Sequence, residues 1–246
     1  APTDQVAQSK TEALEILDDD KHKIIQALWQ NIPDKFFDYT SVDQIALIRD
    51  AIANNNTQET VCITAQHDDG FEVVIYGKDH KGLFHNVVQL LTQHKISIVN
   101  ARIYSGSHEH VMDSFHCLGH YDATLLDSLT SQLLNVLKSQ SYEVQIPQHR
   151  SNRREQHFSV ATEISFTRGR SPKETRMEIK CADQQGLLAS ITACFLTHDI
   201  DVHAAKIATF GHQAEDVFWL SHADNALSKD KASQLMVELN QALSDD

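Results

Sequence analysis

The chain has 246 residues and a mass of 27.7 kDa, a size that favours one large domain or two small ones. Its formal net charge of -13 would repel nucleic-acid phosphates and anionic lipid, so non-specific binders of either are excluded and protein partners or small ligands are favoured. Its four scattered cysteines lack zinc or disulfide spacing and no apolar run could span a membrane, so we expect a reduced, cytoplasmic protein. The chain begins with Ala rather than Met, and no leader pattern follows, which indicates a piece cut from something longer.

The first part of the chain is predicted to be helical. Apolar residues at mostly helical spacing indicate an amphipathic helix over residues 10–30, and Pro33 ends that pattern. Ser41 followed by Gln44 resembles a capping box that opens a second helix, and the run NNN ends it. We assign residues 1–57 to this helical lead-in.

Strand-forming residues begin at Glu59. The segments ETVCITAQ and FEVVIYGKD are rich in β-branched and aromatic residues, and HDDG between them predicts a hairpin turn. A helix over residues 82–94 follows, then strands in ISIVNARIYS and HVMDSFHCLG, a helix in TLLDSLTSQLLNVLKSQ and a possible closing strand in YEVQI. From FEVVIYG onward the order is β-α-β-β-α-β, which predicts an α+β, ferredoxin-like module: a four-stranded antiparallel sheet with both helices on one face. We assign residues 58–148 to this first domain.

The same module occurs a second time. Aligning residues 78–103 with residues 182–207 superposes Asp79 on Asp183, Gly82 on Gly186, Leu83 on Leu187, His94 on His198, Ile96 on Ile200, Ala101 on Ala205 and Ile103 on Ile207. A second domain is therefore predicted over residues 173–246, ending on a helix. Between the two domains lies a linker over residues 149–172, in which HFSVATEISF alternates well enough to be an added strand. The basic run from His149 to Arg154 is interpreted as solvated linker rather than as a docking patch.

The loop that both repeats share points to ligand binding. In each repeat an Asp and a Gly stand where a strand ends and a helix begins, so the first N–H groups of the helix point outward and can hold a carboxylate. Glycine allows close approach of a ligand, and the Asp can receive an ammonium group, so one loop could grip both ends of an α-amino acid. The alternative is structural: Asp79 caps the helix and Gly82 relieves crowding.

These residues carry a resemblance to a known family. The segments KDHKGLF, ISIVNARI and MDSF, and in the second repeat ADQQGLLA, IDVHAAKIATFG and EDVFWL, resemble ACT domains, the regulatory amino-acid-binding modules of many metabolic enzymes. The tandem resembles the C-terminal end of the bifunctional protein-PII uridylyltransferase/uridylyl-removing enzymes. ALWQNIPDKFFDYTSVDQIALI is similar to the segment before their ACT pair, and HFSVATEISF is similar to their inter-ACT strand.

The resemblance implies a regulatory fragment that is not itself an enzyme. It implies glutamine as the effector, control of uridylylation and deuridylylation of the PII signalling protein, and partnership with that protein through the parent enzyme. No nucleotidyltransferase or phosphohydrolase motif is visible, so we expect no cofactor in this chain, and Mg or Mn only in the absent catalytic domains. The sequences HDD at His67 and HEH at His108 are interpreted as turns, and no nucleophile elbow occurs.

The resemblance also implies which residues bind the effector, since ACT pairs hold an amino acid between the strand-to-helix loop of one module and the following strand of its neighbour. The implied residues are Asp79, Gly82, Leu83, Phe84, Ile98, Val99 and Asn100 in the first repeat, and Asp183, Gly186, Leu187, Leu188, Asp201, Val202 and His203 in the second. Asn100 could read a side-chain amide, or it could be a strand-edge residue facing water. His203 is taken as the matching residue, so the two pockets cannot be equivalent.

We also expect ACT–ACT pairing and a possible homodimer. Two other functions remain open. The repeats could form a non-sensing dimerisation or PII-docking module, or the chain could be a free-standing tandem ACT regulator.

Overall fold

The computed structural model describes residue 26 and the ranges 42–55, 58–65, 70–105, 110–139 and 161–244. Gln26 is helical, but the rest of the predicted helix over residues 10–30 lies outside the described residues. The same holds for the HDD turn, most of the HEH turn, the possible strand YEVQI and the basic run from His149 to Arg154.

The chain divides into two compact units that do not coincide with the two repeats. The first unit comprises Ala1–His80, Ile103–Phe115 and His120–Ser139. The second comprises Lys81–Arg102, His116–Gly119 and Gln140–Asp246. The second unit therefore contains the whole second repeat together with one helix, the start of one strand and the end of another strand from the first repeat.

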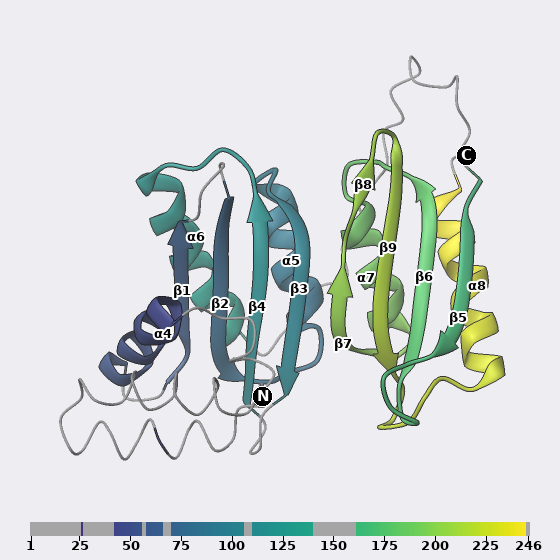
Figure 1. Cartoon of the computed structure of the whole chain (residues 1–246), viewed down its shortest axis with the longest axis horizontal. Coiled ribbons are helices and arrows are strands. Elements are labelled where there is room, and N and C mark those ends of the chain that lie inside the picture. Colours follow the sequence, from purple (N-terminus) through teal and green to yellow (C-terminus); the bar gives the residue numbers. More distant parts are fainter. Residues whose placement is uncertain are drawn as a thin grey trace. The chain divides into compact units, whose positions relative to one another are not determined.

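The first unit is built on the strand order β1-β2-β4-β3 (Figure 1). Its elements are α4 (Val42–Asn54), β1 (Thr60–Ala65), β2 (Gly70–Lys78) and α6 (Ala123–Lys138), with parts of β3 (Ser97–Ser105) and β4 (His110–Leu118). β1 runs antiparallel to β2, with Thr60 opposite Tyr76 and Ala65 opposite Phe71. The predicted second helix of the lead-in is confirmed as α4.

Binary patterning explains why these segments form these elements. β2 is buried on both faces through most of its length, as its run of valine, isoleucine and aromatic residues predicts. Helix α6 buries Leu129, Leu133 and Leu137, which recur at the helical spacing, and Asp122 caps it by accepting from the Leu125 N–H at 2.8 Å. Helix α4 likewise buries isoleucines on one face.

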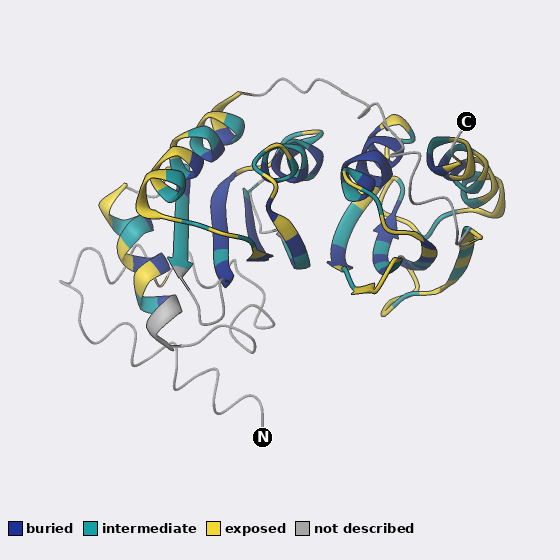
Figure 2. Cartoon of the chain, turned by 90° about the horizontal axis from the view of Figure 1, so that it is seen from above, coloured by how far each residue is buried: buried dark blue, intermediate teal, exposed yellow. Residues whose placement is uncertain are grey.

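The second unit is built on the strand order β3-β7-β9-β6-β5. Its further elements are α5 (Leu83–Gln93), β5 (Glu163–Arg168), β6 (Thr175–Ala182), α7 (Leu187–Thr197), β7 (Asp201–Lys206), β8 (Thr209–Phe210), β9 (Gln213–Ser221) and α8 (Lys229–Leu243). β5, β6, β7 and β9 pair antiparallel with their neighbours. Helices α7 and α8 cover one face of these strands (Figure 2).

Helix α7 occupies the centre of this unit, and nine of its residues are buried. It packs against α5 on one side and α8 on the other, so it has no solvent-facing stripe. Phe195 of α7 meets Phe218 of β9 edge to face, with ring centroids 5.1 Å apart. Helix α8 contributes three leucines to the same core, Leu235, Leu239 and Leu243.

The fourth strand of each sheet comes from the residues ahead of the repeat. β1 pairs with β2 and β5 pairs with β6, so the described order of each module is β-β-α-β-β-α. The added strand predicted in HFSVATEISF is confirmed from Glu163 to Phe166 and continues to Arg168, and it occupies the edge position that a ferredoxin-like sheet gives to its last strand. The α+β class with antiparallel sheets is thereby confirmed. None of the helices among the described residues is long and apolar enough to cross a membrane.

Candidate functional site

The two shared loops have the same backbone geometry. The residue before α5 is Gly82, with φ 85° and ψ 0°, and the residue before α7 is Gly186, with φ 81° and ψ 4°. Both lie in the left-handed region, which costs an L-residue about 1–2 kcal/mol and costs glycine little. The N-cap residue of each helix is the glycine, and not Asp79 or Asp183. No side-chain cap hydrogen bond is made at either N-cap. At the second loop the N–H of Leu187, the first residue of α7, donates to the carbonyl of Gln184 at 3.1 Å.

The loop residues divide into exposed and buried groups. Asp79 and Asp183 are exposed. Leu83 and Leu187 are only 3% and 5% exposed, so their side chains belong to the hydrophobic core and only their backbone could meet a ligand. Phe84 and Leu188 are half-buried. The backbone N–H of Asp183 donates to the carbonyl of His212 at 2.9 Å, which fixes the second loop against the β8–β9 hairpin.

The predicted strand residues lie where the two repeats meet in the second unit. β3 pairs antiparallel with β7, with Asn100 opposite Lys206, Ala101 opposite Ala205 and Arg102 opposite Ala204. The N–H of Ile207 extends this ladder by donating to the carbonyl of Val99 at 3.2 Å. Ile98 is buried, Asp201 is exposed, and Val99, Asn100, Val202 and His203 are half-buried.

This register corrects the match between Asn100 and His203. Ala101 and Ala205 are equivalent in the repeat and lie opposite each other, so the equivalent of Asn100 is Ala204 and that of Val99 is His203. His203 is also the extra residue of a β-bulge between Val202 and Ala204. Its Nε2 lies 2.8 Å from the Ser221 hydroxyl. The match of Asn100 with His203 was wrong, because the gap-free alignment of the two repeats already pairs Asn100 with Ala204.

The loop of the first repeat contacts the second repeat. Lys81, which precedes Gly82, forms an ion pair with Asp199, which lies between α7 and β7. This contact joins the first loop to the residues just before β7 of the second repeat. Sequence reasoning missed both residues, and the aligned repeats carry no signal for them because Lys81 corresponds to Gln185 and Asp199 to Lys95.

A buried carboxyl group near the second loop was also missed. Asp216 of β9 is 1% exposed and accepts the N–H of Ala208 at 3.3 Å. Burial raises the pKa of Asp216 to about 7; the Ala208 hydrogen bond opposes this rise, and the negative charge of Asp183 adds to it. The available signal was the Asp-x-Phe pattern shared by MDSF and EDVF, whose first member, Asp113, is also buried.

Comparison with known proteins gives sequence relatives for nearly the whole chain. No protein-family model matches. The chain is 32% identical over 228 residues to the bifunctional uridylyltransferase/uridylyl-removing enzyme of Pasteurella multocida (strain Pm70), covering 89% of this chain and 26% of that enzyme. It is 30% identical over 270 residues to the enzyme of the same name from Psychrobacter cryohalolentis, covering 99% of this chain and 30% of the relative.

The chain thus spans between about a quarter and a third of the length of these relatives. Among solved structures, the ligand-free regulatory subunit of aspartate kinase from Thermus thermophilus matches 75% of this chain and 99% of its own, at 12% identity and a TM-score of 0.26. The fold assignment above rests on strand order and register instead.

Proposed function

The chain is homologous, along 89% to 99% of its length, to one segment of the bifunctional uridylyltransferase/uridylyl-removing enzymes, and on this premise we propose that it is the amino-acid-sensing regulatory part of such an enzyme. Its effector is glutamine, and the process that it controls is uridylylation and deuridylylation of the PII signalling protein. In this proposal the chain itself supplies recognition and no chemistry. Catalysis, with any Mg or Mn that it needs, belongs to other parts of the parent enzyme.

The observation that carries this proposal is the pair of glycine-capped helix N-termini. Gly82 and Gly186 share one left-handed geometry, and neither helix has a side-chain cap. Such an N-terminus attracts a carboxylate through its N–H groups and the helix dipole. The absence of a Cβ at the cap lets the ligand come close to the backbone. An α-carboxylate is the group that every free amino acid would present to such a cap.

Recognition of the side chain needs a separate polar group. The carbonyl of Val99 is already engaged by Ile207 in the β3–β7 ladder. The half-buried amide of Asn100, opposite Lys206 on the same ladder, has both a donor and an acceptor to offer a glutamine carboxamide. Ala204, its equivalent in the second repeat, has neither, so in this proposal the first repeat's strand reads the effector.

Control of a distant reaction then follows from linkage. If glutamine binds one arrangement of the repeats more tightly than another, it shifts the enzyme toward that arrangement by the difference in binding free energy. Couplings of this kind are typically about 1 to 3 kcal/mol, a change of roughly 5- to 150-fold in the equilibrium. An arrangement that permits uridylyl removal and restrains uridylyl transfer would make the chain a nitrogen-status switch.

Isothermal titration calorimetry tests the proposal directly. Glutamine should bind the chain, and glutamate should bind more weakly because it replaces the amide donor with a second negative charge. Gly82→Val should remove binding at the first loop, and Gly186→Val is the matched control at the second. Absence of any heat with glutamine, under conditions where the chain is folded by circular dichroism, would contradict the proposal.

A second candidate is an assembly module that does not sense a ligand. It is favoured by the direct contact between the repeats, which is made by the β3–β7 ladder and by the packing of α5 on α7. Such a module would bind the PII protein or a second copy of the chain with the same affinity whether or not glutamine is added. Sedimentation with and without glutamine separates the two functions.

A further inference from the structure

Within the second unit the two repeats meet around a local twofold axis. The β3–β7 register places Ala101 opposite Ala205, and these are the same position of the repeat. Asn100 lies opposite Lys206 and Arg102 opposite Ala204, as a twofold relation requires. Helices α5 and α7 pack against each other beside this ladder. A contact built from two near-equivalent surfaces could also form between two first repeats of different chains, so something must select the partner.

One polar contact breaks the symmetry inside the helix pair. His85 of α5 is 2% exposed, and its Nδ1 lies 2.8 Å from the Thr192 hydroxyl of α7. Thr192 donates its own proton to the carbonyl of Ala189 at 3.1 Å, so it must accept from a protonated Nδ1. The Nε2 atom has no partner among the described residues. Burial lowers the pKa of His85, which favours the neutral imidazole over the charged form.

The symmetry mates of these two residues cannot make the same contact. In the aligned repeats Ala189 corresponds to His85, and Val88 corresponds to Thr192. If two first repeats met through this surface, each His85 would face a Val88, and both ring nitrogens would be buried without a partner. An unsatisfied buried polar group costs about 1 to 3 kcal/mol. If two second repeats met, Ala189 would face Thr192, whose hydroxyl still has the Ala189 carbonyl.

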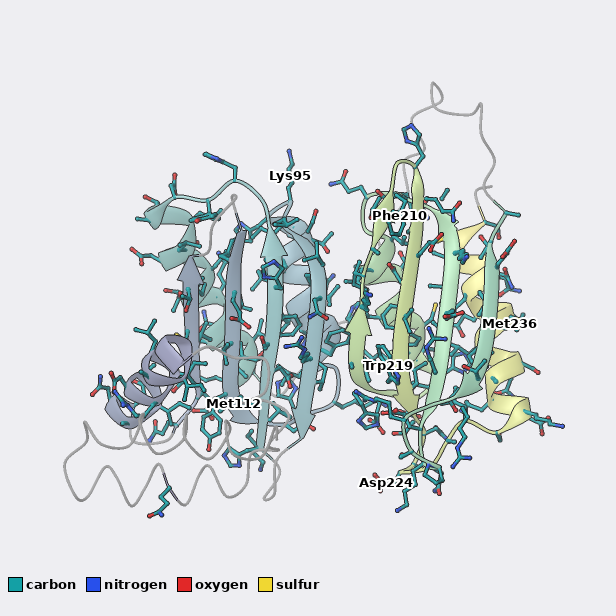
Figure 3. All side chains as sticks on the ribbon, in the orientation of Figure 1. Lys95, Met112, Phe210, Trp219, Asp224 and Met236 are labelled. Carbon is teal, nitrogen blue, oxygen red and sulfur yellow. The ribbon has the colours of Figure 1, made fainter. Side chains whose placement is uncertain are left out.

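An exposed ion pair at the edge of the contact between the repeats also differs from its symmetry mate. Lys81 pairs with Asp199, whose equivalent in the first repeat is Lys95. Lys95 extends outward from the end of α5 (Figure 3). A contact between two first repeats would therefore bring Lys81 of one chain against Lys95 of the other, where the real contact has opposite charges. Both side chains of the ion pair are largely exposed, so this contributes less than the buried contact.

We propose that the surface formed by α5 and the first half of β3 is selective for the second repeat and rejects a second copy of itself, and that the His85–Thr192 hydrogen bond carries most of the selectivity. Any association between copies of the chain then uses first-to-second contacts only. The proposal concerns pairing of the repeats and holds whether or not glutamine is the effector.

Disulfide trapping tests the partner choice, because the twofold axis passes between Ala101 and Ala205. A cysteine introduced by Ala101→Cys would meet its own copy only if two first repeats paired. We expect oxidised Ala101→Cys to show no more cross-linked dimer than wild type, whose Cys62, Cys117, Cys181 and Cys194 set the background. In the double variant Ala101→Cys/Ala205→Cys, we expect the two introduced cysteines, which lie opposite each other in the β3–β7 ladder, to form a disulfide efficiently. A strong dimer band in the single variant would overturn the proposal.

Moving the hydroxyl from the second repeat to the first tests the mechanism. In the Ala101→Cys background, the pair Val88→Thr and Thr192→Val removes the acceptor from α7 and supplies one to His85 of a second copy. We expect cross-linked dimer to rise several-fold over Ala101→Cys alone. The matched control, Val88→Ala with Thr192→Val, leaves both surfaces without a hydroxyl and should give no rise. Equal dimer yields in the two variants would exclude the His85–Thr192 contact as the selector.

Thermal stability gives an independent check that the contact is made. Thr192→Val should lower Tm by roughly 3 to 10 °C because it orphans a second nitrogen of His85. In a His85→Leu background the same change should have little effect, since Thr192 then has only its carbonyl partner to lose. Equal decreases in both backgrounds would mean that the two side chains are not coupled.

Discussion

Arg170 binds Glu174 through three hydrogen bonds across the turn between β5 and β6. Its backbone N–H, Nε and Nη2 lie 2.8, 3.0 and 2.7 Å from the two carboxylate oxygens. The same guanidinium lies over Trp219, 5.1 Å from the ring centroid, and Trp219 is labelled on the strands of the second unit in Figure 3. Burial raises the pKa of Glu174, but the Arg170 hydrogen bonds and charge outweigh it and hold that pKa below its usual value.

Glu174→Gln should therefore destabilise the protein near neutral pH. The loss should be about 1 to 2 kcal/mol, because a charge-assisted pair becomes an ordinary hydrogen bond. The folded-state pKa lies below the unfolded one, so the stabilisation is present above pH 4.5 and is lost as the pH falls through the folded value. Urea denaturation of both proteins at pH 7 and pH 3 measures this. A difference of the same size at both pH values would contradict it.

The contribution of Asp216 to the free energy of unfolding should depend on pH in the opposite direction to that of Glu174. Its pKa of about 7 in the folded protein exceeds the ordinary aspartate pKa of 3.8, so the unfolded state loses its proton first as the pH rises. The free energy of unfolding should be highest below pH 4 and should fall as the pH rises through 7, by at most about 4 kcal/mol. Asp216→Asn should remove this dependence. The check is the difference between variant and wild type across pH 4 to 8, and a constant difference would contradict the shift.

Any residue larger than glycine at position 77 should lower the stability of the protein, because the side chain of Leu137 packs against this position. A Cβ at Gly77 would lie 3.2 Å from Cδ2 of Leu137 and 3.2 Å from Cγ of Glu59. Gly77→Ala should cost about 1 to 3 kcal/mol through overpacking between β2 and α6. In a Leu137→Val background, where that methyl group is drawn back, the same substitution should cost less. Chemical denaturation of the four proteins gives the coupling, and strict additivity would show that the crowding is relieved elsewhere.

Asn100→Ala should weaken glutamine binding without unfolding the chain. The loss of one buried hydrogen-bond partner should lower affinity roughly 5- to 150-fold by calorimetry, with Tm in the absence of ligand nearly unchanged. His203→Ala is the comparison in the second repeat, where Ser221 already engages the imidazole. Unaltered affinity in both variants would remove the strand residues from the site and leave only the loops.

The sequence predicts most of the elements well, because their patterns are local. The spacing of the leucines in α6 and the run of β-branched residues in β2 can each be recognised within one short stretch of sequence. In contrast, the strand with which an edge strand pairs cannot be predicted from the local pattern of that edge strand. Alternation identified the segment that became β5, but nothing in that segment says whether it closes the sheet beside β6 or extends it elsewhere.

The same limit applies to the candidate site. Gly82 and Gly186 could be recognised because a left-handed position restricts the residue type itself. The bulge at His203 and the Lys81–Asp199 contact depend on how distant strands and loops align, and neither leaves a mark on residue identity. Asp216 alternates with Ala214 and Phe218 on the buried face of β9, so its burial could have been read from the strand period, but its polar side chain concealed it.

The early position of β1 and β5 has a consequence for biosynthesis. A ribosome releases the edge strand of each module before the central strand that it joins, so the hairpin partners emerge consecutively and pair at short sequence separation. The last described element of each module is a helix, α6 or α8, which completes the core by packing onto strands already made. Each nascent module can thus form its edge hairpin before its other strands are made, whereas the β3 edge of the first module finds its partner only when β7 has been synthesised.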